Sequence, residues 1–276
     1  MTEIVFLGTG TPNPEPDHQG PSLAIIVDGQ PYLVDCGPGV VRQASAARAL
    51  GVSSLTMEGL SHVFITHLHS DHTLGLPDLI LTPAVTGRLK PLQVWGPAGT
   101  QRMVDHILEA WAADISIRLA GDEPSIPEAY EVRVSEFEEG PIFAEDSLQV
   151  KAFRVTHGHM PNTFGFKFET PDKVVVVSGD TRFDENLVRS AAGCDVLIHE
   201  AYSAKGLEKR EPGWRHYHST YHTSGLELGR LANLVQPKLL LLYHMLPFGE
   251  SREQILDEVR SVYHGDVRIA EDLMRI

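Results

Sequence analysis

Three histidines and one aspartate lie within the six-residue run HLHSDH, from His67 to His72. Imidazole and carboxylate groups are ligands that suit zinc, manganese or iron. His67 and His69 are two residues apart and can point the same way, whereas a turn into a helix would carry Asp71 and His72 toward a second position. The run therefore predicts two adjacent metal sites, and two ions about 3.5 to 4 Å apart typically catalyse hydrolysis.

Strands and helices alternate around this run. The segment from His62 to Thr66 reads as a strand that leads into it, and Asp71 to Leu81 reads as the helix that follows. Other β-branched or aromatic runs bounded by turn residues predict further strands. These are Glu3 to Leu7, Leu23 to Val27, Tyr32 to Asp35, Leu92 to Trp95, Leu148 to Thr156, Phe164 to Glu169, Val174 to Ser178 and Leu239 to Tyr243.

Helices are expected between these strands. Val40 to Leu50 is rich in alanine and is followed by Gly51, and Ala98 to Trp111 follows a Gly-Pro turn. Further helices should follow Thr181, Ser224 and Ser251, the last two of which open capping-box spacings. Because two similar halves each combine strands with helices, we expect an α+β chain with two mixed sheets flanked by helices, an αββα four-layer sandwich. We treat residues 1–276 as a single domain.

Composition bounds the class of protein. The chain has 276 residues, of which 42% are hydrophobic, and this suits a globular core. It has no run of about 18 apolar residues and no signal-peptide pattern, so we expect a cytoplasmic protein that does not enter a membrane. Cys36 and Cys194 lie far apart in the sequence and are expected to be free buried thiols.

The amino-acid composition is strongly acidic. The formal net charge is −14, and the segment from Gly121 to Asp146 carries nine carboxylates against the single basic residue Arg133. Such a balance repels phosphate backbones, so composition disfavours nucleic acid as a partner. The 14 histidines exceed the number in an average chain of this length, and this excess favours a functional site built from histidine.

The run HxHxDH, followed by Thr73-Leu74-Gly75-Leu76, resembles the signature of the metallo-β-lactamase superfamily. This resemblance implies an αββα fold and three further ligands, which are His157, Asp180 and His244. By the same resemblance His67, His69 and His157 would bind one ion, Asp71, His72 and His244 the other, and Asp180 would bridge them. The cofactors expected are two divalent ions, zinc first, with manganese or iron as alternatives.

Three further segments resemble the ribonuclease Z and arylsulfatase branch of that superfamily. They are Phe6 to Pro12 (FLGTGTP), Trp95 to Gly99 (WGPAG) and Leu197 to Ala201 (LIHEA). The segment Tyr221 to Ser224 resembles the HST motif of this branch, with His222 lying 22 residues before His244. The resemblance makes His222 the candidate general acid. A second match four residues earlier, His218-Ser219-Thr220, lies too far from His244 for that role.

A hydrolytic mechanism follows from these assignments. Two divalent ions lower the pKa of a shared water from about 15.7 toward 7 and so supply hydroxide at neutral pH. Asp71 would orient the nucleophile, and His222, held by Glu200, would protonate the leaving oxygen. We also expect His159, His218 and Trp214 to contact the substrate.

The substrate class depends on a missing segment. Ribonuclease Z enzymes carry a long basic arm that grips transfer RNA, and the chain from Glu169 to Ser178 has no room for it. We therefore expect a small or medium-sized substrate with a phosphodiester, a sulfate ester, or a carboxylic ester or lactone. Transfer RNA 3′ processing is the alternative, and iron-dependent redox chemistry on the same fold is the alternative from another class. By resemblance, the chain is also expected to form a homodimer.

Overall fold

The computed structural model describes residues 1–145 and 147–276, so Asp146 of the acidic segment lies outside the described residues. The chain divides into two compact units, and each is described by itself. The N-terminal unit comprises Glu3–Gly8, Pro12–Phe137 and Asp272–Ile276, and the C-terminal unit comprises Met1–Thr2, Thr9–Thr11 and Glu138–Glu271. Whether residues 1–276 act as one domain stays a prediction.

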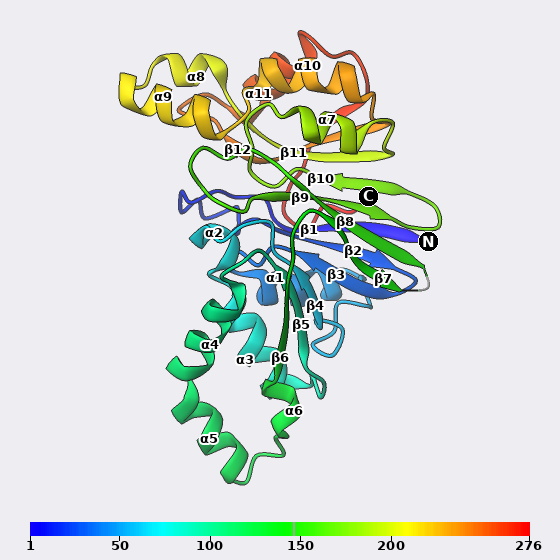
Figure 1. Cartoon of the computed structure of the whole chain (residues 1–276), viewed down its shortest axis with the longest axis vertical. Helices are drawn as coiled ribbons and strands as arrows, with labels where there is room; N and C mark the ends of the chain where they lie inside the picture. The colour runs from blue at the N-terminus through cyan, green and yellow to red at the C-terminus, as the bar shows by residue number, and fades with distance from the viewer. Residues whose placement is uncertain (146) are drawn as a thin grey trace. The chain divides into compact units, whose positions relative to one another are not determined.

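The N-terminal unit contains a six-stranded mixed sheet (Figure 1). Strands β2 and β3 pair antiparallel, whereas β3, β4, β5 and β6 are parallel neighbours. Parallel strands end at the same edge of a sheet, so the loops after β3 and β4 begin side by side. In sheet order the strands are β1 (Thr2–Gly8), β2 (Ser22–Val27), β3 (Gln30–Val34), β4 (His62–Phe64), β5 (Leu92–Gly96) and β6 (Val132–Glu136).

Helices of this unit bury apolar side chains against the sheet. A core of fully buried residues includes Leu33 and Val63 from the strands and Ala44 and Leu79 from the helices. Figure 1 shows α4 and α5 extending beyond the strands, with α6 leading back to β6. The helices are α1 (Val40–Ala49), α2 (Ser70–Thr73), α3 (Leu76–Thr86), α4 (Thr100–Ala110), α5 (Ala112–Ala120) and α6 (Pro127–Tyr130).

The C-terminal unit contains a seven-stranded mixed sheet. Strands β7 to β10 pair antiparallel in succession, and β10 to β13 are parallel. The strands are β7 (Gly140–Glu145), β8 (Leu148–Arg154), β9 (Phe164–Glu169), β10 (Val174–Val177), β11 (Val196–Tyr202), β12 (Leu239–Leu246) and β13 (Val267–Ile269). A tight turn, closed by a hydrogen bond from the Thr170 N–H to the Lys173 carbonyl, joins β9 to β10 and leaves no place for an arm there.

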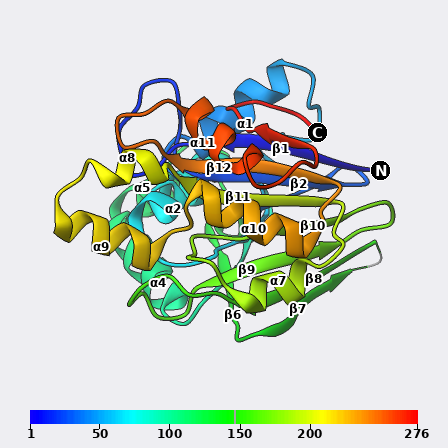
Figure 2. The same ribbon diagram turned by 90° about the horizontal axis from the view of Figure 1, so that it is seen from above.

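Helices α7, α10 and α11 lie over this sheet, as Figure 2 shows. Ser224 caps α10 in a complete capping box with Glu227, as predicted, and Ser251 caps α11. A core separate from that of the other unit includes Leu187, Leu228 and Ile255. The helices are α7 (Glu185–Ala191), α8 (Ala204–Glu208), α9 (Pro212–Tyr221), α10 (Gly225–Val235) and α11 (Arg252–Arg260).

The predicted class, α+β with two mixed sheets flanked by helices, is confirmed. Cys36 and Cys194 are buried free thiols, as expected. The single helix expected from Asp71 to Leu81 is wrong in detail: α2 ends at Thr73, and α3 starts at Leu76 with Pro77 in its first turn. Proline has no N–H to continue a helix from the preceding turn, so it marks a new start. No helix within the described ranges is long and apolar enough to cross a membrane.

Candidate metal ligands and catalytic residues

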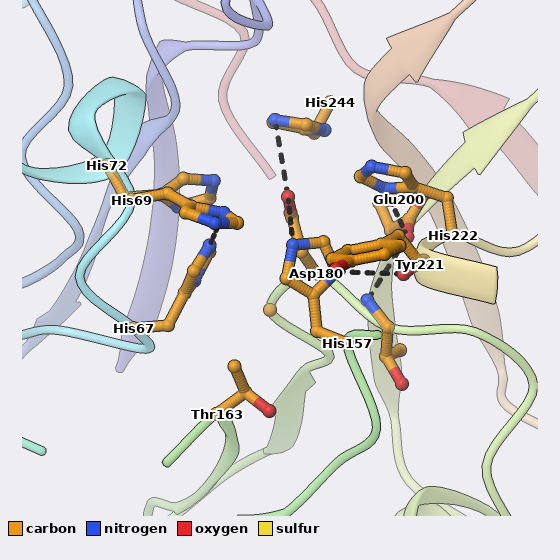
Figure 3. A network of polar contacts seen from close by, with 12 residues as sticks. His67, His69, His72, His157, Thr163, Asp180, Glu200, Tyr221, His222 and His244 are labelled. Atoms are coloured by element: carbon orange, nitrogen blue, oxygen red, sulfur yellow. Dashed lines mark hydrogen bonds and ion pairs between the residues drawn. The ribbon is translucent and has the colours of Figure 1, made fainter. Parts of the chain in front are cut away.

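In the N-terminal unit the predicted metal-binding run lies just beyond the end of β4. His67 Nε2 lies 3.0 Å from His69 Nδ1, and the rings of His67 and His72 are 4.2 Å apart. Two imidazole nitrogens that bind one zinc at about 2.0 to 2.1 Å in tetrahedral geometry lie about 3.3 Å from each other. The spacing of the His67 and His69 nitrogens therefore fits a shared ion. Figure 3 shows these three side chains turned toward one another.

A buried carboxylate that the sequence analysis did not single out holds this run. Asp35 Oδ2 lies 2.8 Å from His72 Nδ1, and Oδ1 accepts the Thr66 N–H at 2.8 Å. The Thr66 hydroxyl also donates to Asp35, at 2.9 Å from Oδ2. Because the carboxylate accepts the Nδ1 proton of His72, Nε2 carries the lone pair that a metal needs. The available signal was a carboxylate at the end of an otherwise apolar strand.

Two glycines allow the loops of this half to approach closely. A Cβ on Gly75 would lie 2.3 Å from the Gly37 carbonyl oxygen, and one on Gly37 would lie 2.7 Å from the Asp71 carbonyl oxygen. The Cys36 N–H donates to the His72 carbonyl at 2.9 Å, which joins the turn after β3 to α2. The glycines therefore let backbone hydrogen bonds position the run.

In the C-terminal unit the predicted ligands gather around Asp180, in the turn after β10. Asp180 Oδ2 lies 4.0 Å from His157 Nε2 and 3.7 Å from His244 Nε2. Ligand atoms of His157, Asp180 and His222 all lie within 4.8 Å of one another. With Asp180, His157 and His244 offer two imidazoles and a carboxylate, a donor set that fits a divalent transition metal.

The backbone of α9 orients His157. Its Nδ1 lies 2.8 Å from the Tyr221 carbonyl oxygen, which accepts its proton and leaves Nε2 facing Asp180. The Tyr221 ring packs against Gly158, where a Cβ would lie 2.1 Å from the ring. Gly158 also has φ of 54°, so glycine satisfies both the conformation and the contact.

His222 and Glu200 form the pair that the sequence predicted. His222 Nδ1 lies 3.0 Å from Glu200 Oε1, which also accepts the Thr181 N–H at 3.1 Å. Burial, and then the negative charge of Asp180, raise the pKa of the Glu200 carboxyl well above its usual value. The charge of His244 opposes that shift.

His244 reaches its position through a β-bulge. The sequence analysis placed it after a strand ending at Tyr243, but β12 continues to Leu246. In the pairing with β11, Tyr243 lies opposite Glu200 and Met245 opposite Ala201, so His244 is the extra residue, with φ of 46°. A bulge redirects one side chain without ending the strand, which explains the difference.

The two candidate HST segments have different environments. Thr223 is buried and its hydroxyl donates to the Thr181 carbonyl at 2.6 Å, which ties the segment after His222 to the turn that holds Asp180. Ser219 and Thr220 lie on α9, and their hydroxyls donate to the His216 carbonyl. These contacts favour the segment that begins at His222, rather than the one that begins at His218, as the counterpart of the HST motif.

The predicted substrate contacts all lie on or beside α9, which the sequence analysis missed because none of its residues is fully buried, although His218 is partly buried. Trp214 is 57% exposed and stacks on His218, with ring centroids 5.7 Å apart. Burial lowers the pKa of His218 to about 4. His159 is exposed and lies edge-on to Tyr221 at 6.3 Å. Contact of these three residues with a substrate stays a prediction.

Comparisons with known proteins agree with this arrangement. Residues 31–245 match the family model described as "Beta-lactamase superfamily domain". Ribonuclease Z of Mycobacterium bovis (strain BCG / Pasteur 1173P2) is 34% identical over 282 residues, covering 100% of this chain and 98% of that protein. Both matched regions span the segments from Asp35 to His244 that carry the residues described above.

Solved structures share the fold. The metallo-β-lactamase fold protein YhfI from Bacillus subtilis matches with a TM-score of 0.75 and 19% identity, covering 100% of this chain and 98% of that one. Human tRNase Z, short form, matches with a TM-score of 0.71 and 24% identity, covering 99% and 98%. The predicted metallo-β-lactamase fold is therefore confirmed.

The expectation that nucleic acid is disfavoured as a partner is wrong. It is overturned by relatives that are named ribonucleases and that match the whole chain. The error came from using net charge, which sums the entire surface. A phosphate responds mainly to charges within a Debye length, about 8 to 10 Å at physiological salt, so an acidic protein can still bind RNA locally.

Proposed function

Because the chain belongs to the ribonuclease Z branch of the metallo-β-lactamase superfamily, we propose that it is an endoribonuclease that processes the 3′ end of transfer RNA precursors. The observation that carries this proposal is the 34% identity to a ribonuclease Z over the full chain. Membership in the family makes the chain a metal-dependent hydrolase, and cleavage of an RNA phosphodiester is the finer assignment that we propose.

Two divalent ions, zinc in the first place, are the proposed cofactors. The proposed ligands are those that the family pattern assigns, namely His67, His69, Asp71, His72, His157, Asp180 and His244. Within each unit the nitrogen and carboxylate spacings support metal binding. When bound, such ions supply a nucleophile at neutral pH and neutralise charge on the phosphate.

The side chains of this protein provide orientation and proton transfer. Asp35 and the Tyr221 carbonyl hold His72 and His157 with their Nε2 atoms available. Asp71 is proposed to orient the attacking water. His222, held at 3.0 Å by Glu200, is proposed to give its proton to the leaving ribose oxygen. A ribose alkoxide is a poor leaving group, so this proton matters more for RNA than for activated esters.

The test compares RNA with small esters. Purified protein loaded with zinc is given a labelled transfer RNA precursor with a 3′ trailer and, in parallel, bis(p-nitrophenyl) phosphate, p-nitrophenyl sulfate and a carboxylic ester. We expect cleavage of the precursor at one position near the trailer, abolished by a chelator and restored by zinc. Turnover of the sulfate or carboxylic ester without cleavage of any RNA would contradict the proposal. Elemental analysis of the same sample should find two zinc ions per chain, and one ion or none would refute the cofactor assignment.

A further inference from the structure

Two adjoining hollows lie on the helical face of the C-terminal unit. One, with a volume of about 540 Å³, is lined by residues of α8, α9 and the start of α10. The other, of about 740 Å³, is lined by residues of α7, α9 and α10. Ser219, Glu227 and Arg230 line both, so the hollows form one groove. Figures 1 and 2 place α7, α9 and α10 on the same side of the sheet in this unit.

Three exposed arginines reach this groove from different segments. Arg215 comes from α9, Arg230 from α10, and Arg182 from the turn that precedes α7. None of these guanidinium groups forms an ion pair with a carboxylate among residues 1–145 and 147–276. Guanidinium N–H groups in a planar fork match the geometry of a phosphate. The groove therefore presents three donors suited to phosphates.

The carboxylates along the groove are mostly engaged by the fold. Asp184 accepts two backbone N–H groups as the cap of α7, and Glu227 completes the capping box of α10. Glu185 pairs with Arg189 at 3.8 Å. Glu208 is the fourth acidic residue in the lining. With Arg189 counted, four arginines and four carboxylates line the groove and balance in formal charge. The groups whose partners do not come from the fold are mainly the arginines.

The groove begins beside the proposed catalytic residues of the same unit. Arg182 lies two residues after Asp180, and Ser219 lies three residues before His222. The hydrogen bond from Thr223 to the Thr181 carbonyl joins these two segments. An RNA strand that leaves the catalytic residues along this face would meet the arginines next.

We infer that this groove binds the sugar-phosphate backbone of the RNA substrate, with Arg182, Arg215 and Arg230 as phosphate contacts. The inference rests on the proposed function. The groove would also supply RNA contacts that a basic arm makes in other ribonuclease Z enzymes, because the tight turn between β9 and β10 has no such arm. A small ester would not extend along two hollows of this size, whereas a chain of phosphates would.

The experiment measures RNA binding by the full-length protein with fluorescence anisotropy, using a labelled precursor transfer RNA at several salt concentrations. The groove variant is Arg215→Gln/Arg230→Gln. The slope of log K against log salt is negative, and each lost phosphate contact reduces its magnitude by about 0.7 to 0.9, so two should reduce it by about 1.4 to 1.8. We expect affinity near 0.1 M salt to fall on the order of 10-fold.

The matched control is Lys205→Gln/Lys209→Gln, which removes the same charge from α8 and its end. Both lysines already pair with Glu250, and neither lines the groove. Thermal midpoints of both variants report whether each is folded. A large loss in the groove variant with a small loss in the control supports the inference.

Equal losses in the two variants, or none in a folded groove variant, would overturn it. Failure of the unmodified protein to bind or cleave any RNA, with turnover of bis(p-nitrophenyl) phosphate intact, would instead reject the proposed function and the RNA occupant together.

Discussion

Replacing Asp35 by asparagine should cost a metal ion without unfolding the chain. The two carboxylate oxygens have different partners: Oδ1 accepts the Thr66 N–H, and Oδ2 accepts the His72 Nδ1 proton. A backbone N–H cannot reverse its role, so the asparagine oxygen should stay with Thr66. The new NH₂ group then faces His72, whose Nδ1 must become an acceptor. The imidazole proton moves to Nε2, the atom proposed to bind metal.

The size of the effect follows from these contacts. To restore the productive tautomer, two donors would have to face each other in a buried site, which costs about 1 to 3 kcal/mol. Loss of such an outer partner typically weakens metal binding by about 10-fold to 100-fold. We therefore expect Asp35→Asn to bind the ion held by His72 about 10-fold to 100-fold more weakly, while the other ion changes less.

Competition with a zinc chelator, combined with elemental analysis, measures this directly. Asp105→Asn on the exposed face of α4 is the control, because it makes the same chemical change far from any proposed ligand in the sequence. The thermal midpoint of the metal-free proteins shows whether the fold survives. If Asp35→Asn holds two zinc ions with the affinity of the control, the proposed role of Asp35 is refuted.

Three further predictions concern the C-terminal unit. Gly158→Ala places a Cβ 2.1 Å from the Tyr221 ring at φ of 54°. The free energy of unfolding, measured by urea titration, should therefore fall by about 2 to 3 kcal/mol. An unchanged urea midpoint would contradict the contact. His222→Ala should slow RNA cleavage by about 10² to 10⁴-fold but should slow the hydrolysis of bis(p-nitrophenyl) phosphate far less, because p-nitrophenolate leaves without a proton. Equal losses of activity on the two substrates would argue against a general acid. Burial lowers the pKa of His218 to about 4, below the unfolded value of about 6.5, so its neutral form stabilises the fold above pH 6.5 and this contribution is lost as pH falls toward 4. The fall in thermal midpoint between pH 7.5 and pH 4.5 should therefore be smaller in His218→Gln, and a parallel fall in both proteins would count against this.

Local patterns predicted most of the fold, because most strands are apolar runs that end at turn residues. Ser224 and Glu227 show how far such signals reach, since their spacing alone predicted a capping box that the structure contains. Helix α9 is an element that such local signals did not predict. None of its side chains is fully buried, so no apolar periodicity marks it, and Pro212 in its first turn is a local feature that fits a helix N-terminus.

The candidate site divides in the same way. The spacing from His67 to His72 is local and was visible in the sequence, as was the pair His222 and Glu200 once the family motifs were matched. Asp35 was missed because its role depends on β3 lying beside β4 in the sheet, which is a tertiary fact. The bulge at His244 was missed for a related reason, because a bulge is defined by the partner strand.

The structure also suggests why the outer partners come from backbone and buried carboxylates rather than from solvent-exposed groups. His72 is fixed by Asp35 within the N-terminal unit, and His157 by the Tyr221 carbonyl within the C-terminal unit. Each unit therefore sets the tautomer of its own histidine through contacts made when that unit folds. A histidine already in the metal-binding tautomer does not have to lose an Nε2 proton on metal binding, so less of the binding free energy is spent on reorganisation. If this reasoning holds, Asp35→Asn and a change that displaces Tyr221, such as Gly158→Ala, should weaken metal binding additively, because the two changes share no contact.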